Sequence, residues 1–164
     1  MKARGKKACS GETTDTFYCT VNGWRRSFIF GVNPRRGSKI DELLGDKPYD
    51  DWDDVEVLGT IQHHNSDRKA RRRIFTTVDI RIHPTHVPRD KWRDDPEVIG
   101  GVWTGKEKLR VNVSVAADTY HSLITCFASN HFREIRLEVR NLHYTQGSLY
   151  RISFDPEETP LEDM

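Results

Sequence analysis

Several segments of this sequence alternate apolar and polar residues with a period of two. The clearest is IFTTVDIRI, in which Ile74, Thr76, Val78, Ile80 and Ile82 are predicted to share one face. Successive side chains of a β-strand point to opposite faces of the sheet, so this period indicates a half-buried strand. The same alternation recurs in KLRVNVSV and in EIRLEVR. A chain built from such segments is predicted to be mainly β-sheet.

Turn residues stand between these segments and predict hairpins. Asn22-Gly23 separates TFYCTV from SFIFGV, Gly105-Lys106-Glu107 separates VIGGVWT from KLRVNVSV, and Gln146-Gly147 divides the last pair. A tight turn at residues 65–67 is predicted to join DVEVLGTIQHH to the strand that follows it. Gly59 is predicted to carry a β-bulge, because the apolar alternation weakens there.

One segment follows a helical period instead. In ADTYHSLITCFASN an apolar stripe recurs at i, i+3, i+4 and i+7, made by Tyr120, Leu123, Ile124 and Phe127. Asp118 suits the N-terminal end of such a helix, and Asn130 suits a left-handed stop. About eight strands and one helix over residues ~117–129 predict an antiparallel β-sandwich or open barrel that the helix covers. The alternative is an α+β fold with the helix packed on one sheet.

The length of 164 residues predicts a single domain, 1–164, that needs no disulfide or metal to hold its core. Only 35% of the residues are hydrophobic and 31% are charged, which indicates a heavily charged surface. The basic start MKARGKKACSGE and the acidic end DPEETPLEDM predict flexible tails over 1–14 and 156–164.

The sequence predicts a cytoplasmic protein that does not enter a membrane. Its basic N-terminus lacks the apolar core of a secretory signal, and no stretch approaches the roughly 20 apolar residues of a membrane helix. Three cysteines without export indicate reduced thiols. The net charge of +1 argues against indiscriminate coating of nucleic acid but permits a local basic patch.

The basic stretch HHNSDRKARRRIF is one candidate contact surface. At the tip of a hairpin, its cations could lie along a nucleic acid and neutralise phosphates, or dock to a protein. Edge lysines and arginines also keep a hairpin tip soluble. Three consecutive arginines on a strand must face both sides, which requires a partner for a guanidinium that turns inward. The predicted contact residues are Arg68, Lys69, Arg71, Arg72 and Arg73.

The loop HPTHVPRDKWRDD is the second candidate, because Trp92 stands there among basic residues. An aromatic ring interleaved with cations can stack on a base and hold its phosphate, or anchor a protein partner. Folding the ring back over the barrel is the structural alternative. The predicted contact residues are Arg89, Lys91, Trp92 and Arg93.

The sequence does not predict a metal site, a cofactor or a catalytic centre. Two histidine pairs, His63 with His64 and His83 with His86, are expected at opposite ends of a strand roughly 30 Å apart. A short helix from Ser38 to Gly45 is expected before a flexible acidic loop, which could hold a cation or meet a basic surface. That loop contains Asp50, Asp51, Asp53 and Asp54. Neither HExxH, CxxC, GxSxG nor a phosphate-binding glycine loop is present.

We therefore predict a non-enzymatic binding module that contacts its partner through the basic hairpin tip and the Trp92 loop. A protein partner is favoured, because acidic and basic patches on a near-neutral molecule give register and a fast association rate. Nucleic-acid binding through residues 68–73 is the first alternative, and a metal-dependent enzyme is the second. Pairing of the acidic segment with a basic surface of another copy would make a homo-oligomer.

Overall fold

The computed structural model describes residues 12–32, 49–67, 73–85 and 99–155. These residues form strands and one helix. The strands are β1 (Thr14–Val32), β2 (Tyr49–Ser66), β3 (Thr77–Thr85), β4 (Gly100–Thr104), β5 (Lys108–Ala116), β6 (Glu134–His143) and β7 (Gln146–Asp155), and the helix is α2 (Ala117–Ala128). The tails predicted at both termini lie largely outside this part of the chain, although Thr14 is the first residue of β1. The helix predicted from Ser38 to Gly45 also lies outside it.

The seven described strands close into a barrel in the order β1-β2-β3-β5-β4-β7-β6, and β6 pairs with β1 to complete the ring. The prediction of a mainly-β barrel with one covering helix is confirmed. Unlike the expected open antiparallel arrangement, the barrel is closed and β3 lies parallel to β5. Because the ring of described strands is closed, it has no free sheet edge. The free edges of an open barrel could pair with another chain and cause aggregation.

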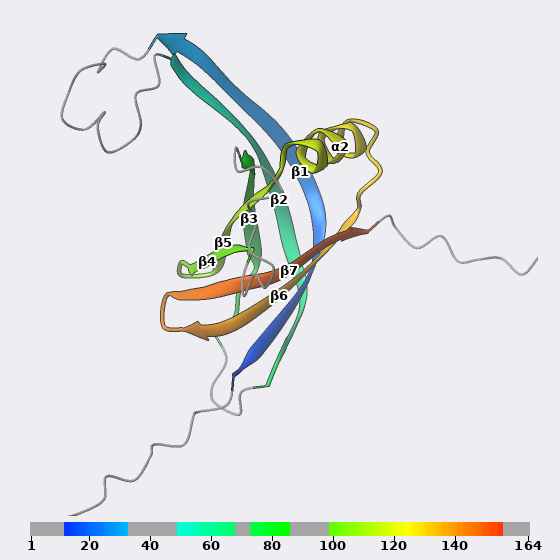
Figure 1. The fold of residues 1–164 in the computed structure, drawn as a ribbon. Coiled ribbons are helices and arrows are strands. Elements are labelled where there is room, and N and C mark those ends of the chain that lie inside the picture. The colour runs from blue at the N-terminus through cyan, green and yellow to red at the C-terminus, as the bar shows by residue number, and fades with distance from the viewer. Residues whose placement is uncertain (1–11, 33–48, 68–72, 86–98, 156–164) are drawn as a thin grey trace, which may run out of the picture.

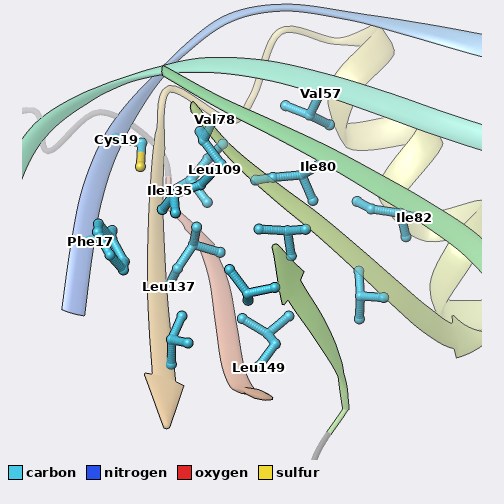
Figure 2. Close-up of a cluster of buried hydrophobic side chains, with 14 of the residues drawn as sticks. Phe17, Cys19, Val57, Val78, Ile80, Ile82, Leu109, Ile135, Leu137 and Leu149 are labelled. Atoms are coloured by element: carbon cyan, nitrogen blue, oxygen red, sulfur yellow. The ribbon is translucent and has the colours of Figure 1, made fainter. Parts of the chain in front are cut away.

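The barrel interior is filled by the apolar half of each alternating strand (Figure 2). Ile80, Leu109 and Leu137 are fully buried, whereas the arginines beside them along the strands, Arg81, Arg110 and Arg136, are exposed. Small barrels of this kind are packed cores rather than pores. Chemistry that needs solvent must therefore take place on the outside of the barrel or on segments that project from it.

The helix α2 packs against the barrel through the apolar stripe predicted for it. Tyr120 and Phe127 are buried, and the Phe127 ring contacts the rings of Trp24 and Phe154. The chain leaves the helix through Asn130, whose φ of 52° is the predicted left-handed stop. Within the described residues, no helix is long and apolar enough to cross a membrane.

The hairpin predicted at Asn22-Gly23 is wrong, because these residues lie within β1, a single strand of 19 residues. β2 pairs with β1 from Asp15↔Ser66 to Val32↔Tyr49, and Asn22 is the extra residue of a bulge between Val21↔Gly59 and Gly23↔Leu58. The Asn22 amide donates a hydrogen bond to Thr60 Oγ1 at 2.7 Å. A turn-forming residue is thus used to bend a long strand around the barrel.

The bulge predicted at Gly59 lies in the facing strand instead: the inward alternation Val55, Val57, Gly59 is unbroken, and the register shift next to Val21↔Gly59 comes from the extra residue Asn22 in β1. A β-carbon added at Gly59 would lie 2.8 Å from the carbonyl oxygen of Thr20 and 3.0 Å from Val78 Cγ1. Glycine is therefore required here so that β1 and β3 can both lie close to β2.

The tight hairpin predicted at residues 65–67 does not form. The β2–β3 register ends at Thr60↔Thr77, and beyond that point β2 pairs with β1. Ile74, predicted to be in the core, is 77% exposed, whereas Phe75 is buried against Phe17. The period of two cannot be extended to residues 73–76, because β3 begins only at Thr77.

The acidic segment predicted as a flexible loop is part of β2 instead. Residues 27–32 of β1 and 49–54 of β2 pair only with each other among the described strands, because the β2–β3 register starts at Val55 and the β1–β6 register stops at Thr20. This two-stranded segment, which we call the arm, extends past the rest of the barrel toward the upper left of Figure 1.

Candidate binding surfaces

A groove of about 350 Å³ lies on the outside of the barrel over the adjacent strands β3, β5 and β4. Two rows of outward-facing positions cross these strands. One row runs Asp79, Arg110, Trp103, and the other runs Arg81, Asn112, Gly101. The parallel pairing of β3 with β5 is what brings the two arginines into neighbouring rows.

Trp103 lies across the bare backbone of its own strand. A β-carbon added at Gly101 would be 2.6 Å from the Cη2 atom of the indole, so the six-membered end of the ring occupies the space that a side chain would fill. The tryptophan nevertheless keeps 45% of its surface exposed. An aromatic ring that is supported on one side and accessible to solvent is suited to stacking on another flat group.

The cations beside this ring are incompletely paired. Arg110 has no ion-pair partner among the described residues, and Arg81 lies 3.8 Å from a Glu56 carboxylate that also binds Arg25. Lys108 Nζ is 3.0 Å from Asp79 Oδ2, while Asp79 Oδ1 is buried and has no hydrogen-bond partner in this part of the chain. The groove therefore offers guanidinium donors that are not saturated by carboxylates.

A second hollow of about 360 Å³ lies over β1, β6 and β7, and it is less suited to an anion. Its aromatic residue, Tyr18, is already covered by the Arg136 guanidinium, 5.6 Å from the ring centre. Arg136 is in turn 2.8 Å from Glu138, and Glu134 and Asp155 add further carboxylates to the lining and its neighbourhood. The charged side chains of this hollow therefore largely neutralise one another.

His83 and Ser114 form a polar pair on the outside of the neighbouring parallel strands, where they are directly in register. Ser114 Oγ lies 2.6 Å from His83 Nε2. Burial lowers the pKa of His83, and the nearby Asp54 carboxylate opposes that shift. The pair resembles the nucleophile and base of a hydrolase, but no hydrogen bond from Asp54 orients the imidazole within the described residues. We assign no catalytic role to it.

The arm presents three large apolar side chains to solvent. Phe28, Ile29 and Trp52 are 63%, 59% and 52% exposed. Phe28 is in register with Asp53, whereas Ile29 is in register with Trp52. Since paired residues share a face and successive residues alternate, apolar groups occupy both faces of the arm.

Of the contact residues predicted from the sequence, Arg68, Lys69, Arg71, Arg72, Arg89, Lys91, Trp92 and Arg93 lie outside the described residues. Arg73 is described, and its guanidinium is engaged within the chain. It donates hydrogen bonds to Thr104 Oγ1 at 3.2 Å, to the Tyr144 carbonyl at 3.1 Å and to the Gly105 carbonyl at 2.9 Å. This arginine joins two turns of the barrel.

The three described histidines of the two predicted pairs are each bound to a different neighbour. His63 Nε2 is 2.7 Å from Asn65 Oδ1, His64 Nε2 is 2.9 Å from Asp15 Oδ1, and His83 contacts Ser114. His86 lies outside the described part of the chain. Within that part, no three histidine, cysteine or carboxylate side chains come together to hold a metal ion.

Sequence reasoning missed both the arm and the Trp103 groove. The groove depends on the order of strands around the barrel, for which the sequence has no local signal. The arm had one, because SFIFGV and YDDWDD each combine β-forming residues with an unusual density of apolar or acidic groups. In comparisons with protein-family models, with curated proteins and with solved structures, nothing matched this chain.

Proposed function

We propose that this protein is a non-enzymatic binding module that docks to a protein partner through the β1–β2 arm. The observation that carries the proposal is the exposure of Phe28, Ile29 and Trp52 on a two-stranded segment outside the barrel. A lone pair of strands is marginally stable in water, and exposed aromatic residues on it add to that cost. Burial against a partner would remove both penalties.

The partner that fits the arm is a protein with an apolar cleft edged by lysine or arginine. The two strand segments of the arm, SFIFGV and YDDWDD, contain four aspartates and neither lysine nor arginine, and two of these aspartates are already used within the chain, since Asp53 is paired with Arg26 and Asp54 is buried. Apolar side chains on both faces favour insertion into a cleft over contact with a flat surface. Exposed aromatic anchors flanked by charge are the usual composition of the dominant residues of a protein interface.

The base of the arm is held rigid, which favours docking without reorganisation. Arg26 donates hydrogen bonds to both carboxylate oxygens of Asp53, at 2.9 and 2.6 Å, and Tyr120 of α2 donates to the same residue at 2.6 Å. An arm that is already positioned loses little conformational entropy on binding.

Site-specific photo-crosslinking in the cell that makes the protein tests the proposal. A benzophenone amino acid is placed at Phe28 or Ile29, and, as the matched control, at Tyr144, which is 94% exposed in the β6–β7 turn. We expect the same protein to be crosslinked from both arm positions and not from position 144. Trp52→Ser in the same background should weaken that complex by about 30-fold or more.

Three outcomes would count against this assignment. Equal crosslinking from positions 28 and 144, or none from either arm position, would remove the arm as the docking surface. Crosslinking of one copy to another would replace the separate partner with self-association, and sedimentation velocity of the Trp52→Ser variant would then show a loss of oligomer.

The basic stretch 68–72 and the Trp92 loop remain proposed as additional contact surfaces, with nucleic acid as the alternative partner for the basic stretch. Arg73 is a weaker candidate for that role, because its guanidinium already makes three hydrogen bonds within the barrel. The compartment we propose is the cytoplasm, with which the free thiols Cys19 and Cys126 are compatible.

A further inference from the structure

We propose that the Trp103 groove on the outside of β3, β5 and β4 binds a nucleotide unit, with the base stacked on Trp103 and the phosphate held by Arg81 and Arg110. The proposal is independent of the arm, which lies on β1 and β2. It also uses none of the basic residues of the 68–73 stretch.

The stacking position is built into the strand. Gly101 removes the side chain that would otherwise collide with the indole, so the ring rests on the strand and retains an exposed surface. Base stacking on a protein aromatic ring needs such a supported, accessible face, and it accepts any base because all of them are flat.

The anion-binding position lies beside the ring. Arg110 is in register with Trp103 on the adjacent strand, and Arg81 lies one strand farther on, in register with Asn112. Neither guanidinium is saturated by a carboxylate, since Arg110 has no ion-pair partner among the described residues and the Arg81–Glu56 distance is 3.8 Å. Guanidinium groups bind phosphate oxygens with directed hydrogen bonds.

The spacing favours a ligand with its ring and its anion at separate ends. Trp103 and Arg81 stand on strands two apart, about 10 Å at the backbone. A nucleotide matches this, because the sugar separates the base from the phosphate. Asp79 also lines the groove, on the same strand as Arg81, and its Oδ1 is buried without a donor in this part of the chain.

The same nucleotide unit can come from a free mononucleotide or from single-stranded nucleic acid. Binding is measured with the full chain by fluorescence anisotropy of a labelled single-stranded oligonucleotide, and by competition with adenosine and uridine monophosphates. A clear affinity advantage of the oligonucleotide identifies the polymer as the source, and equal binding per site identifies the mononucleotide. Duplex DNA is the negative control, because its bases are not free to stack on a side chain.

Trp103→Leu should weaken binding about tenfold or more by removing the stacking surface. Arg81→Gln and Arg110→Gln should each lower the affinity and reduce the slope of log affinity against log salt by about 0.7 for a single strand. The matched controls are Arg151→Gln, an exposed arginine on β7, and Tyr144→Asn, an exposed aromatic residue in a turn. Both controls should bind as the parent does, and thermal melting should confirm that all five variants are folded.

The proposal is overturned if no nucleotide or oligonucleotide binds. It is also overturned if binding survives Trp103→Leu unchanged, if duplex DNA binds as well as the single strand, or if the Arg151→Gln control has the same salt slope as Arg110→Gln. Phosphotyrosine is included as a probe, and binding of that compound without nucleotide binding would replace the proposed ligand class. Failure of these assays leaves crosslinking from the arm unaffected, so the two proposals are tested separately.

Discussion

The hydroxyl of Tyr120 donates a 2.6 Å hydrogen bond to Asp53 Oδ1 and so joins the single described helix to the base of the arm. Tyr120 has no exposed surface, while Asp53 also binds Arg26 of β1, just below the arm. Burial, and then the bond to Asp53, raise the pKa of Tyr120 far above its usual value, so the hydroxyl stays a donor at any physiological pH.

Removal of this hydroxyl should loosen the arm. Tyr120→Phe keeps the ring in the core and deletes one hydrogen bond to a charged group, which typically contributes about 1–3 kcal/mol. We expect that loss in the free energy of unfolding measured with urea. Tyr144→Phe is the control, since its side chain is exposed in a turn and should leave the stability unchanged. Equal stability of the two variants would show that the helix–arm bond contributes nothing.

Asp53 should make the stability of the protein depend on pH in the acid range. Its hydrogen bonds from Arg26, and secondarily from Tyr120, hold the pKa of this carboxyl below its ordinary value. The stabilisation is complete above the unfolded pKa of about 3.9 and disappears as the pH falls through the lower folded pKa. Urea unfolding at several pH values should show a shallower loss for Asp53→Asn than for the parent. Parallel curves would contradict this assignment.

Gly23 and Gly59 lie on opposite strands beside the β1–β2 bulge. Substitution by alanine should change the stability of the protein differently at the two positions. Gly59→Ala places a carbon 2.8 Å from the Thr20 carbonyl oxygen and 3.0 Å from Val78, so the strands must separate, at a cost of about 1–3 kcal/mol. Gly23→Ala meets no atom within 4 Å and should be neutral or slightly stabilising. Thermal melting of the two variants compares them directly, and a melting temperature of Gly59→Ala equal to that of the parent would contradict the close packing.

Arg73 should act as a structural arginine. Its planar fork reaches Thr104, Gly105 and Tyr144 at once, which a lysine ammonium cannot do from one position. Arg73→Lys should therefore cost about 1 kcal/mol and speed amide hydrogen exchange in the β4–β5 and β6–β7 turns. Arg151→Lys retains charge at an exposed position and should alter neither. If amide hydrogen exchange in both turns is the same in Arg73→Lys as in the parent, the Arg73 side chain does not hold the turns and instead contacts solvent or a partner.

Two predictions from local pattern, the helix stripe and the turn at residues 105–107, are confirmed, whereas the last turn falls at residues 144–145, just before the predicted Gln146-Gly147. The helix stripe through Tyr120 and Phe127 and the turn at residues 105–107 follow from neighbours in the sequence. Asn22-Gly23 was misread because a two-residue turn and a bulge use the same residues, and only the partner strand distinguishes them. Ile74 was predicted to be buried and Phe75 exposed, whereas the structure shows the reverse. The reason is similar, since a period of two does not show where the strand begins.

The two candidate surfaces also differ in how much of each the sequence indicates. The sequence contains the exposed aromatic and charged residues of the arm, but it also suggested a loop at residues 50–54, because aspartate is rare in strands. The Trp103 groove brings together residues from β3, β4 and β5, and no sequence spacing predicts that β5 lies between the other two.

By itself, the sequence determined that this chain is mainly β, that one helix follows β5, and which residues of β3, β5 and β6 are buried, because these properties arise from side-chain periodicity and the hydrophobic effect. The tertiary structure alone decided the closure of the barrel, the parallel pairing of β3 with β5, the projection of the arm, and the placement of Trp103 over Gly101 beside Arg81 and Arg110. The physical reason is that pairing between distant strands is selected by the packing of the whole core, which no single segment encodes.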